Sequence, residues 1–395
     1  MPPECITAEV AVRGRAVPHH PEISICILVL ENTGLLLECL DALRRPGARV
    51  EAMEIVVVAN GTPKDQLELL LRCDDIVLVV NEFNLGFASG CNQAASVARA
   101  PLLLFLNDDS LVQDGCIEAL VGACENDPSI GAVGARILSE DGTLEEAGSV
   151  IWRDGSASHV GEGLDSDSHT FMEPRWVDYS SANGLLVVRS AWDEVGGFDE
   201  GYFPAYFEDV DLSLTLAAHG YRTRYEPRAA LVHHRSQSTS TVFREFLLTR
   251  NHLRLVEKWG AKLDRFEPPP AKDSGPEFEA AIDRAVRRAS ESQRMPYEPH
   301  PESLPSRSMH DLFDPQRATA ELRAAYVAYL EERVVGADRR IRMLEDYLKK
   351  LWGVKLRRWV AGRLFRPQNG PRRTAPAPPD HSEDTVNAQK RPNRA

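Results

Sequence analysis

The segment PLLLFLNDDS, residues 101–110, changes from apolar to polar within a few positions. Its run LLLFL is apolar on both faces of an extended chain, which is typical of a strand buried inside a sheet. An amide, two carboxylates and a hydroxyl follow directly: Asn107, Asp108, Asp109 and Ser110. Because neighbouring carboxylates repel each other, the segment indicates a buried strand that ends at a functional site.

Three further apolar runs precede this segment, and amphipathic stretches separate them. The predicted strands span residues 23–30, 53–59, 75–80 and 102–106, and the predicted helices include residues 35–43 and 89–100. Buried strands that alternate with helices are typical of a parallel sheet covered on both faces, so the predicted fold class is α/β. Between residues 131 and 234 the pattern is less regular, which predicts a second, mixed half of the same domain.

Polar or glycine-containing loops follow all four predicted strands. These loops include Glu31, Asn60, the segment 81–90 and Asn107. The carboxyl ends of parallel strands meet at one edge of a sheet, where open α/β sheets bind their ligands. Gly86 and Gly90 are predicted to let the backbone approach a ligand, ahead of a helix N-terminus that favours an anion. The pattern predicts a nucleotide site.

The polar cluster at residues 107–110 offers oxygen ligands for a cation. Mg²⁺ and Mn²⁺ prefer such ligands and are often shared with substrate phosphates. Asp109 is the first candidate metal ligand, and Asp108 and Asn107 are candidates to orient a sugar or a metal-bound water. The alternative interpretation is that Asn-Asp-Asp-Ser caps a helix near Asp114.

A second acidic cluster, Glu208, Asp209 and Asp211, follows the aromatic stretch YFPAYF at residues 202–207. Acidic residues in a first helical turn often only complement the helix dipole. Beside aromatic rings on which a sugar can stack, a carboxylate can instead act as a general base.

Two histidines, His233 and His234, occur in LVHHRSQST at residues 231–239, after another short apolar run. A single histidine is usually structural or lies on the surface. A pair at a strand end is a better candidate for a metal or phosphate contact.

Together these segments resemble the successive motifs of family 2 glycosyltransferases of the GT-A fold, and most of all their rhamnosyltransferase-like branch. The motifs are FLNDDS, NLGFASGCNQAA, GGFDEGYF, FEDVDLSLTLAAHGYR and LVHHRSQS, and the resemblance covers residues 23–263. It implies a Rossmann-like, mostly parallel sheet with a mixed acceptor-side half, followed by a C-terminal helical extension. It also implies inverting transfer from a nucleotide-diphosphate sugar to a hydroxyl of a growing cell-surface glycan or a lipid-linked acceptor.

The resemblance also implies roles for single residues. Asn107, Asp108 and Asp109 would bind the diphosphate and its Mg²⁺ or Mn²⁺, with His233 as a second metal or diphosphate contact and His234 as the less favoured candidate. Asp209 would be the general base, with Glu208 beside it. Glu31, Asn60, Asn84, Gly86 and Gly90 lie on loops that resemble nucleotide-binding ones. The chain departs from the family at Ala59, where many relatives have an aspartate that holds the nucleobase of the donor.

Composition limits the partners and the compartment. Lys and Arg number 46 against 59 Asp and Glu, a formal net charge of −13, which disfavours bulk attraction to nucleic acid. The seven cysteines form no Cys-x-x-Cys pair. No apolar run approaches the roughly 20 residues that span a bilayer. A cytoplasmic protein without a nucleic-acid partner is therefore expected.

Composition also suggests the domain boundaries. The predicted parts are a flexible leader at 1–20, a glycosyltransferase domain at 21–263, a Pro-rich linker at 264–317, a helical segment at 318–366 and a disordered tail at 367–395. Apolar spacings of three and four over residues 327–351 predict either a coiled-coil homodimer or a helix packed on the core. Residues 354–366 mix aromatic and basic side chains, which predicts either peripheral contact with the inner face of the cell membrane or a solvated helix end.

Two other functions compete with the glycosyltransferase interpretation. A non-catalytic sugar-nucleotide-binding scaffold is favoured by Ala59 and by the coiled-coil pattern, but both acidic motifs are intact. A sugar nucleotidyltransferase is disfavoured because VLENTGLLLE, residues 29–38, stands where a Gly-rich loop with Arg and Lys would follow the first strand.

Overall fold

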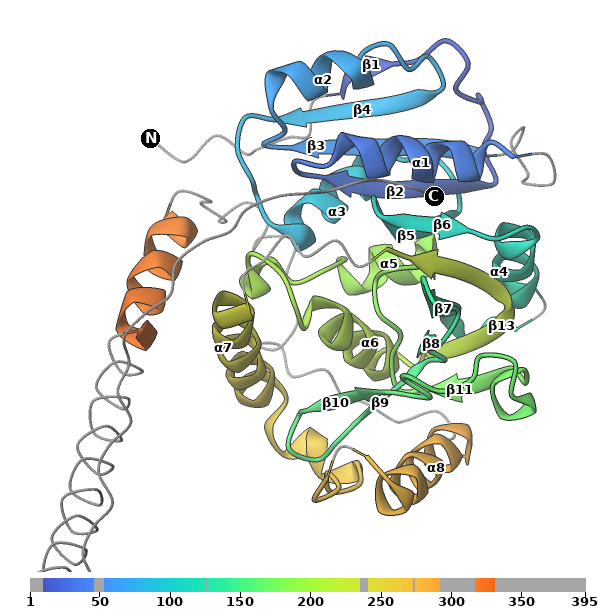
Figure 1. Cartoon of the computed structure of the whole chain (residues 1–395), viewed down its shortest axis with the longest axis vertical. Coiled ribbons are helices and arrows are strands. Elements are labelled where there is room, and N and C mark those ends of the chain that lie inside the picture. The colour runs from blue at the N-terminus through green and yellow to red at the C-terminus, as the bar shows by residue number, and fades with distance from the viewer. Residues whose placement is uncertain are drawn as a thin grey trace, which may run out of the picture. The chain divides into compact units, whose positions relative to one another are not determined.

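The computed structural model describes residues 10–45, 53–125, 127–234, 241–272, 274–291 and 317–330. The chain divides into two compact units, Met1–Tyr329 and Leu330–Ala395. The first unit is built on a large mixed sheet with the strand order β1-β4-β3-β2-β5-β12-β7-β13-β11 (Figure 1). Strands β6 and β8 pair with β13 and β7 beside this path.

The first half of the sheet is parallel, as predicted. Its strands are β2 (Ile23–Val29), β3 (Met53–Asn60), β4 (Ile76–Asn81) and β5 (Leu102–Asn107), which pair in the order β4-β3-β2-β5. Their central residues are buried on both faces, because helices cover the sheet on each side. The α/β prediction is confirmed.

Two layers of helices enclose the sheet. Helices α1 (Thr33–Leu43), α2 (Lys64–Leu70) and α4 (Cys116–Cys124) bury apolar side chains against one face. Helices α3 (Phe87–Val97), α5 (Arg189–Val195) and α6 (Glu208–Ala218) pack on the other face. The sheet therefore lies in the centre, with its strand ends open to loops.

The second half of the sheet is mixed, which confirms that prediction too. β12 (Leu185–Val188) runs antiparallel between β5 and β7 (Ile130–Ser139), and β13 (Arg222–His233) runs parallel to β7. The remaining strands are β6 (Ser110–Val112), β8 (Leu144–Glu146) and β11 (Arg175–Val177), and a separate pair, β9 (Ser149–Ile151) and β10 (Ala157–His159). Short 3₁₀ helices lie at His169–Phe171, Glu200–Tyr202 and Gly260–Arg265.

The predicted flexible leader at 1–20 is partly ordered. β1 (Val10–Arg13) pairs antiparallel with β4 and forms an edge of the sheet. An edge strand of four residues is too short for its pattern to be recognised in the sequence. Residues 1–9 lie outside the described part of the chain.

The predicted linker at 264–317 contains an ordered helix. Helix α7 (Thr241–Trp259) ends the predicted catalytic region, and α8 (Pro276–Glu291) then packs against the region of β9 and β11. Arg288 of α8 pairs with Asp178 at 2.5 Å and with Glu267 at 2.8 Å. The helix was missed because its buried face consists mostly of alanines, which give a weak apolar signal between Pro-rich stretches.

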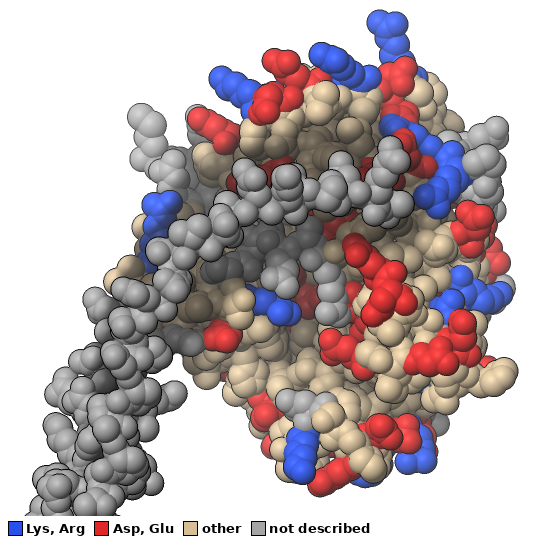
Figure 2. Space-filling view, in the orientation of Figure 1, with Lys and Arg blue, Asp and Glu red and all other residues tan. Residues whose placement is uncertain are grey.

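Residues 317–330 are helical, and Tyr326 lies 4.7 Å, ring to ring, from Phe243 of α7. The predicted coiled coil from residue 331 onward, the basic segment 354–366 and the tail 367–395 lie outside the described residues. Within the part that is described, no helix is both long and apolar enough to cross a bilayer. Figure 2 shows acidic side chains gathered near the centre of this face of the molecule.

Candidate active site

Asp109 lies in the tight turn between β5 and β6. β6 pairs with the end of β13, with Ser110 opposite His233. This pairing brings Oδ1 of Asp109 to 3.1 Å from Nε2 of His233, and the backbone N–H of His234 donates to the carbonyl oxygen of Asp109 at 2.9 Å. The first acidic motif and the histidine pair therefore meet at one strand end.

His233 lies between two carboxylates. Its Nδ1 is 3.0 Å from Oε1 of Glu145, on β8, and its Nε2 faces Asp109. Burial alone would lower the pKa of this imidazole, but the hydrogen bonds to Asp109 and Glu145 outweigh burial and raise the pKa to about 9. His234 instead pairs with the exposed Glu140 at 2.6 Å. Sequence reasoning missed Glu145, because one glutamate in a turn-rich stretch carries no local signal.

Asp108 and Asn107 are both half-buried at the same strand tip. Burial, together with the negative charge of Asp109, raises the pKa of Asp108 to about 7. Within the described ranges, no group of three or more His, Cys, Asp or Glu side chains is arranged to hold a metal ion. A divalent cation at Asp109 and His233 would therefore take further oxygen ligands from a phosphate group, as Mg²⁺ commonly does.

Asp209 lies in the first turn of α6. Its carboxylate accepts hydrogen bonds from the backbone N–H of Val210 at 2.8 Å and of Ala182 at 3.3 Å. Burial raises the pKa of Asp209 to about 6, although these two donors act in the opposite direction. A carboxylate with this pKa is ionised at neutral pH and is a stronger base than an exposed aspartate, which suits a general base.

Glu208, the neighbour of Asp209, is in a different state. It is 6% exposed, and its Oε2 has no hydrogen-bond partner in the described part of the chain. Burial and the charge of Asp209 raise the pKa of Glu208 well above its ordinary value. Burial therefore favours the protonated form of Glu208, and Asp209 remains the candidate base of the pair.

The segment 180–183 joins the two acidic motifs. Ala182 donates its N–H to Asp209, and the side chain of Asn183 accepts from the N–H of Asn107 at 3.2 Å and from the hydroxyl of Ser110 at 2.8 Å. Because a backbone N–H can only donate, the accepting atom of Asn183 is Oδ1. Its buried Nδ2 has no partner among the residues described.

Glu146 holds this joining segment in place. It is 1% exposed, and its Oε1 accepts from the hydroxyl of Ser180 at 2.9 Å and from the N–H of Ser181 at 3.0 Å. Adjacent residues of β8 thus serve the two motifs: Glu145 contacts His233, and Glu146 fixes the segment that contacts Asp209. Sequence reasoning missed Asn183 and Glu146, since their partners are remote in the chain.

The predicted nucleotide loops lie after β2, β3 and β4, but Asn60 differs from its predicted role. Its side chain is fully buried, with Nδ2 donating to Asn84 at 3.0 Å and to the carbonyl of Gly86 at 3.2 Å. Its Oδ1 accepts from Asn81 and from the N–H of Leu85, each at 3.0 Å. Asn60 therefore shapes the loop after β4 and is not free to contact a nucleobase.

Two other members of the predicted nucleotide set remain accessible. Glu31 is exposed directly after β2, and Asn84 is exposed in the loop after β4. Both follow strands of the parallel half, so they lie at the edge of the sheet where the sequence placed a ligand.

The two glycines of α3 also differ from prediction, because the close neighbours that the structure shows are protein atoms. A Cβ on Gly86, whose φ is +86°, would lie 2.7 Å from the ring of Phe203. A Cβ on Gly90 would lie 2.2 Å from Cδ1 of Leu28. These glycines let α3 approach β2 and the loop before α6, which sequence reasoning mistook for an approach to a ligand.

Comparison with protein families identifies two overlapping models. Residues 24–170 match the model described as Glycosyl transferase family 2, and residues 102–267 match the model described as Glycosyl transferase family group 2. The matched region contains both acidic motifs and the histidine pair.

Two curated relatives share this region. The chain is 31% identical over 228 residues to the O-antigen biosynthesis protein RfbC of Myxococcus xanthus, which covers 55% of this chain and 18% of that protein. It is 32% identical over 211 residues to the N-acetylglucosaminyl-diphospho-decaprenol L-rhamnosyltransferase of Mycobacterium tuberculosis (strain ATCC 25618 / H37Rv), covering 46% of this chain and 64% of the relative. The chain thus spans less than two thirds of both relatives.

A solved structure shares the fold. The crystal structure of GalNAc-T7 with UDP, GalNAc and Mn²⁺ aligns with a TM-score of 0.50 at 17% sequence identity, covering 74% of this chain and 55% of that chain. This likeness concerns the fold alone.

Proposed function

Because this chain belongs to glycosyltransferase family 2, we propose that it is an inverting enzyme that moves a sugar from a nucleotide-diphosphate sugar to an acceptor hydroxyl. One observation carries the proposal: neighbouring residues, Ala182 and Asn183, contact the base candidate Asp209 and the turn that contains Asp109. A candidate diphosphate site and a candidate base are thereby tied to each other. A protein that only bound nucleotide would not require this coupling.

Asp109 and His233 are the residues that would hold Mg²⁺ or Mn²⁺ together with the donor diphosphate. Glu145 holds Nδ1 of His233, so that Nε2 and Asp109 face each other, and a cation bound between them would displace the proton on Nε2. When bound, the cation supplies positive charge that stabilises the leaving diphosphate. The crystals of the fold neighbour contain UDP and Mn²⁺, which supports a nucleotide and a divalent cation as ligands but assigns no residue.

Asp209 would take the proton of the acceptor hydroxyl. As the acceptor oxygen forms its bond to the anomeric carbon, the bond from that carbon to the diphosphate oxygen breaks on the opposite face, and the electron pair leaves with the nucleoside diphosphate. The two backbone N–H groups on Asp209 keep its carboxylate oriented during this transfer. Glu208, whose pKa is raised by burial, lies beside Asp209 in the first turn of α6.

The loops at Glu31 and Asn84 would enclose the nucleotide, and Asn107 and Asp108 would face the donor sugar. The names of the two relatives support a cell-surface glycan or a lipid-linked acceptor. We also propose a cytoplasmic protein, with peripheral membrane contact through residues 354–366 and a homodimer through residues 327–351. We propose a glycosyltransferase domain at residues 21–263, preceded by a segment that contributes β1 and followed by a segment that contains α8.

Isothermal titration of UDP, GDP and dTDP, each with and without Mn²⁺, tests the donor site. We expect Mn²⁺-dependent binding of one nucleotide to the wild-type protein and its loss in Asp109→Ala. Asp74→Ala is the matched control, since Asp74 is exposed and remote from the site. Absence of binding for all three nucleotides would contradict the proposal and favour a scaffold function.

A further inference from the structure

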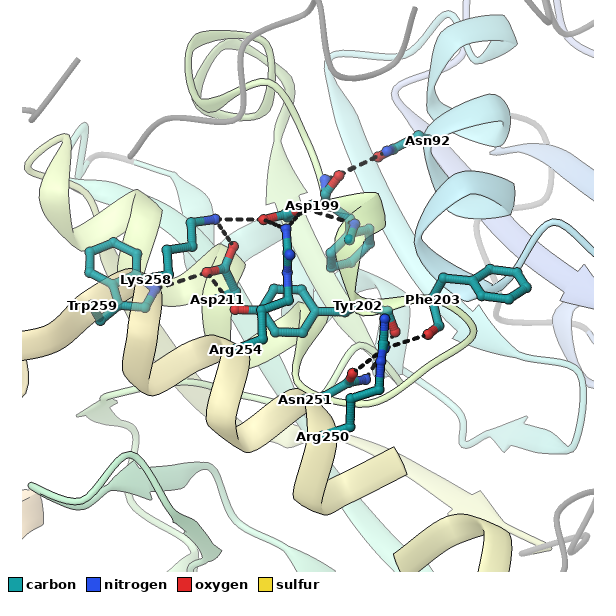
Figure 3. Close-up of polar contacts among 12 residues, drawn as sticks. Asn92, Asp199, Tyr202, Phe203, Asp211, Arg250, Asn251, Arg254, Lys258 and Trp259 are labelled. Carbon is teal, nitrogen blue, oxygen red and sulfur yellow. Dashed lines mark hydrogen bonds and ion pairs between the residues drawn. The ribbon is translucent and has the colours of Figure 1, made fainter. Parts of the chain in front are cut away.

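Helix α7 contacts the loop that leads into Glu208 and Asp209 (Figure 3). Four polar residues of α7, spaced at helical intervals, face residues 199–211: Arg250, Asn251, Arg254 and Lys258. The proposed mechanism uses none of them. Their contacts are directed at the backbone and at acidic side chains that flank the base, not at the base itself.

Asn251 makes the densest set of these contacts. Its side chain is fully buried, and the two hydrogens of Nδ2 are shared among the carbonyl oxygens of Tyr202 at 3.0 Å, Ala205 at 2.9 Å and Tyr206 at 2.9 Å. Its Oδ1 accepts from Arg250 at 2.7 Å, which assigns the orientation of the amide. One amide therefore gathers three carbonyl groups of a single loop.

The loop that Asn251 holds is strained at its end. Tyr206 and Phe207 have φ values of +79° and +75°, a left-handed backbone conformation that residues other than glycine rarely adopt. Phe207 is also the N-cap of α6, so Glu208 and Asp209 follow the strained pair directly. If either residue returned to a negative φ, the first turn of α6 and the carboxylate of Asp209 would turn away.

A second anchor fixes α6 at Asp211, two positions after Asp209. Lys258 lies 2.7 Å from Oδ2 of Asp211 and 2.9 Å from Oδ2 of Asp199, while Nε1 of Trp259 donates to Asp211 at 2.8 Å. The hydroxyl of Tyr202 donates to the same carboxylate at 3.1 Å. Because α7 holds Asp211, the position of Asp209 depends mainly on the backbone conformation of Tyr206 and Phe207. Asn251 binds this backbone on the N-terminal side of α6.

We propose that Asn251 is a positioning residue for the general base: it holds the left-handed backbone of Tyr206 and Phe207 and so aims Asp209 at the acceptor hydroxyl. This inference rests on the proposed glycosyl transfer. It assigns to α7 a role in the proton-transfer step. The hydrogen bonds of Asn251 go to residues 202, 205 and 206, whereas the loop after β4 meets this segment at Phe203 and Pro204.

The first test separates turnover from nucleotide binding. For Asn251→Ala we expect kcat to fall about 10- to 100-fold, since small misplacements of a catalytic group cost that much, with the Kd for the nucleotide and Mn²⁺ unchanged within about threefold. Arg288→Met is the control, because it removes buried contacts of α8 far from this loop. We expect kcat of the control, per folded protein, to stay within about twofold of wild type.

The second test asks whether the strained backbone of Phe207 is the reason that turnover needs Asn251. Glycine adopts positive φ without steric cost, so a chain with Phe207→Gly has less tendency to leave the left-handed conformation. In a double-mutant cycle, the loss of kcat caused by Asn251→Ala should be at least about threefold smaller in the Phe207→Gly background than in wild type. A residue that only supported the fold would give equal losses in both backgrounds.

The outcomes are distinguishable. If the wild-type protein transfers sugar and Asn251→Ala has the same kcat, the role of Asn251 is overturned while the proposed function stands. Equal losses of kcat in the two backgrounds of the double-mutant cycle have the same meaning. If Asn251→Ala and Asn251→Ser both unfold or lose nucleotide binding, Asn251 supports the whole domain and the inference is overturned. Absence of transfer by wild type with any donor overturns the proposed function as well.

Discussion

Oε1 of Glu145 lies 3.0 Å from Nδ1 of His233, whereas the adjacent His234 contacts Glu140 at 2.6 Å. The two pairs have the same chemistry but opposite surroundings. Glu145 and His233 lie mostly buried beside Asp109, and Glu140 is exposed. Sequence reasoning favoured His233 over His234 through resemblance, and the structure supplies a physical difference between them.

Replacing Glu145 tests that difference. Glu145→Gln removes the carboxylate that orients the ring of His233, so we expect Mn²⁺-dependent nucleotide binding to weaken about 10- to 100-fold. Glu140→Gln is the matched control and should bind as wild type. The measurement is calorimetric titration, and a larger effect from Glu140→Gln would assign the metal contact to His234.

Replacing the base should separate chemistry from binding. Asp209→Asn keeps the size of the side chain, but an amide cannot take the proton of the acceptor hydroxyl. We therefore expect kcat to fall about 10²- to 10⁴-fold. Nucleotide binding should persist, because Asp109 is untouched. Asp193→Asn, at an exposed position of α5, serves as control for a charge change. Retained turnover in Asp209→Asn would mean that another group accepts the proton.

The pH dependence of kcat/KM follows from the pKa of Asp209, which burial raises to about 6. A general base works only when deprotonated, so kcat/KM should be constant above this pKa and fall as the pH drops through about 6. The profile should be measured at saturating Mn²⁺, since a bound cation keeps Asp108 ionised. An acid limb near pH 4, typical of an exposed aspartate, would contradict this assignment.

Asn183 should stabilise the turn that carries Asp109. Asn183→Ala leaves the buried N–H of Asn107 and the hydroxyl of Ser110 without their acceptor, which should lower the free energy of unfolding by about 1–3 kcal/mol. We also expect weaker nucleotide binding, because the turn loses its fixed position. Chemical denaturation and titration measure the two effects. Wild-type values for both would show that Asn183 is dispensable.

Gly90 tests the corrected interpretation of α3. A methyl group there would meet Leu28 at 2.2 Å, so Gly90→Ala should destabilise the fold by about 1–3 kcal/mol through overpacking. Leu28→Ala in the same chain should recover part of that loss, which thermal unfolding of the single and double variants can show. If the double variant is as unstable as the sum of the single ones, the contact with Leu28 is not the cause.

The parallel strands could be predicted because each is a continuous apolar run bounded by polar residues, a signal that does not depend on distant partners. The strands from β2 to β5 therefore begin and end close to their predicted positions. The edge strand β1 and the helix α8 lack that signal, since one has four residues and the other buries mainly alanine.

The candidate site was predictable only where its residues lie in motifs. Asp109, Asp209 and His233 stand in recognisable segments, and the pairing of β6 with β13 brings two of them together. Glu145 and Asn183 act through partners far along the chain, so no local pattern marks them. The same reason explains the error at Gly86 and Gly90, whose close neighbours belong to other segments.

The antiparallel strand β12 has a consequence for ligand exchange. It is hydrogen-bonded to β5 on one side and to β7 on the other, so the parallel and mixed halves belong to one continuous sheet. A hinge between the halves would have to break one of these two ladders. Donor entry and product release would therefore depend on rearrangement of the loops at the strand ends and not on a hinge motion of the two halves as rigid bodies.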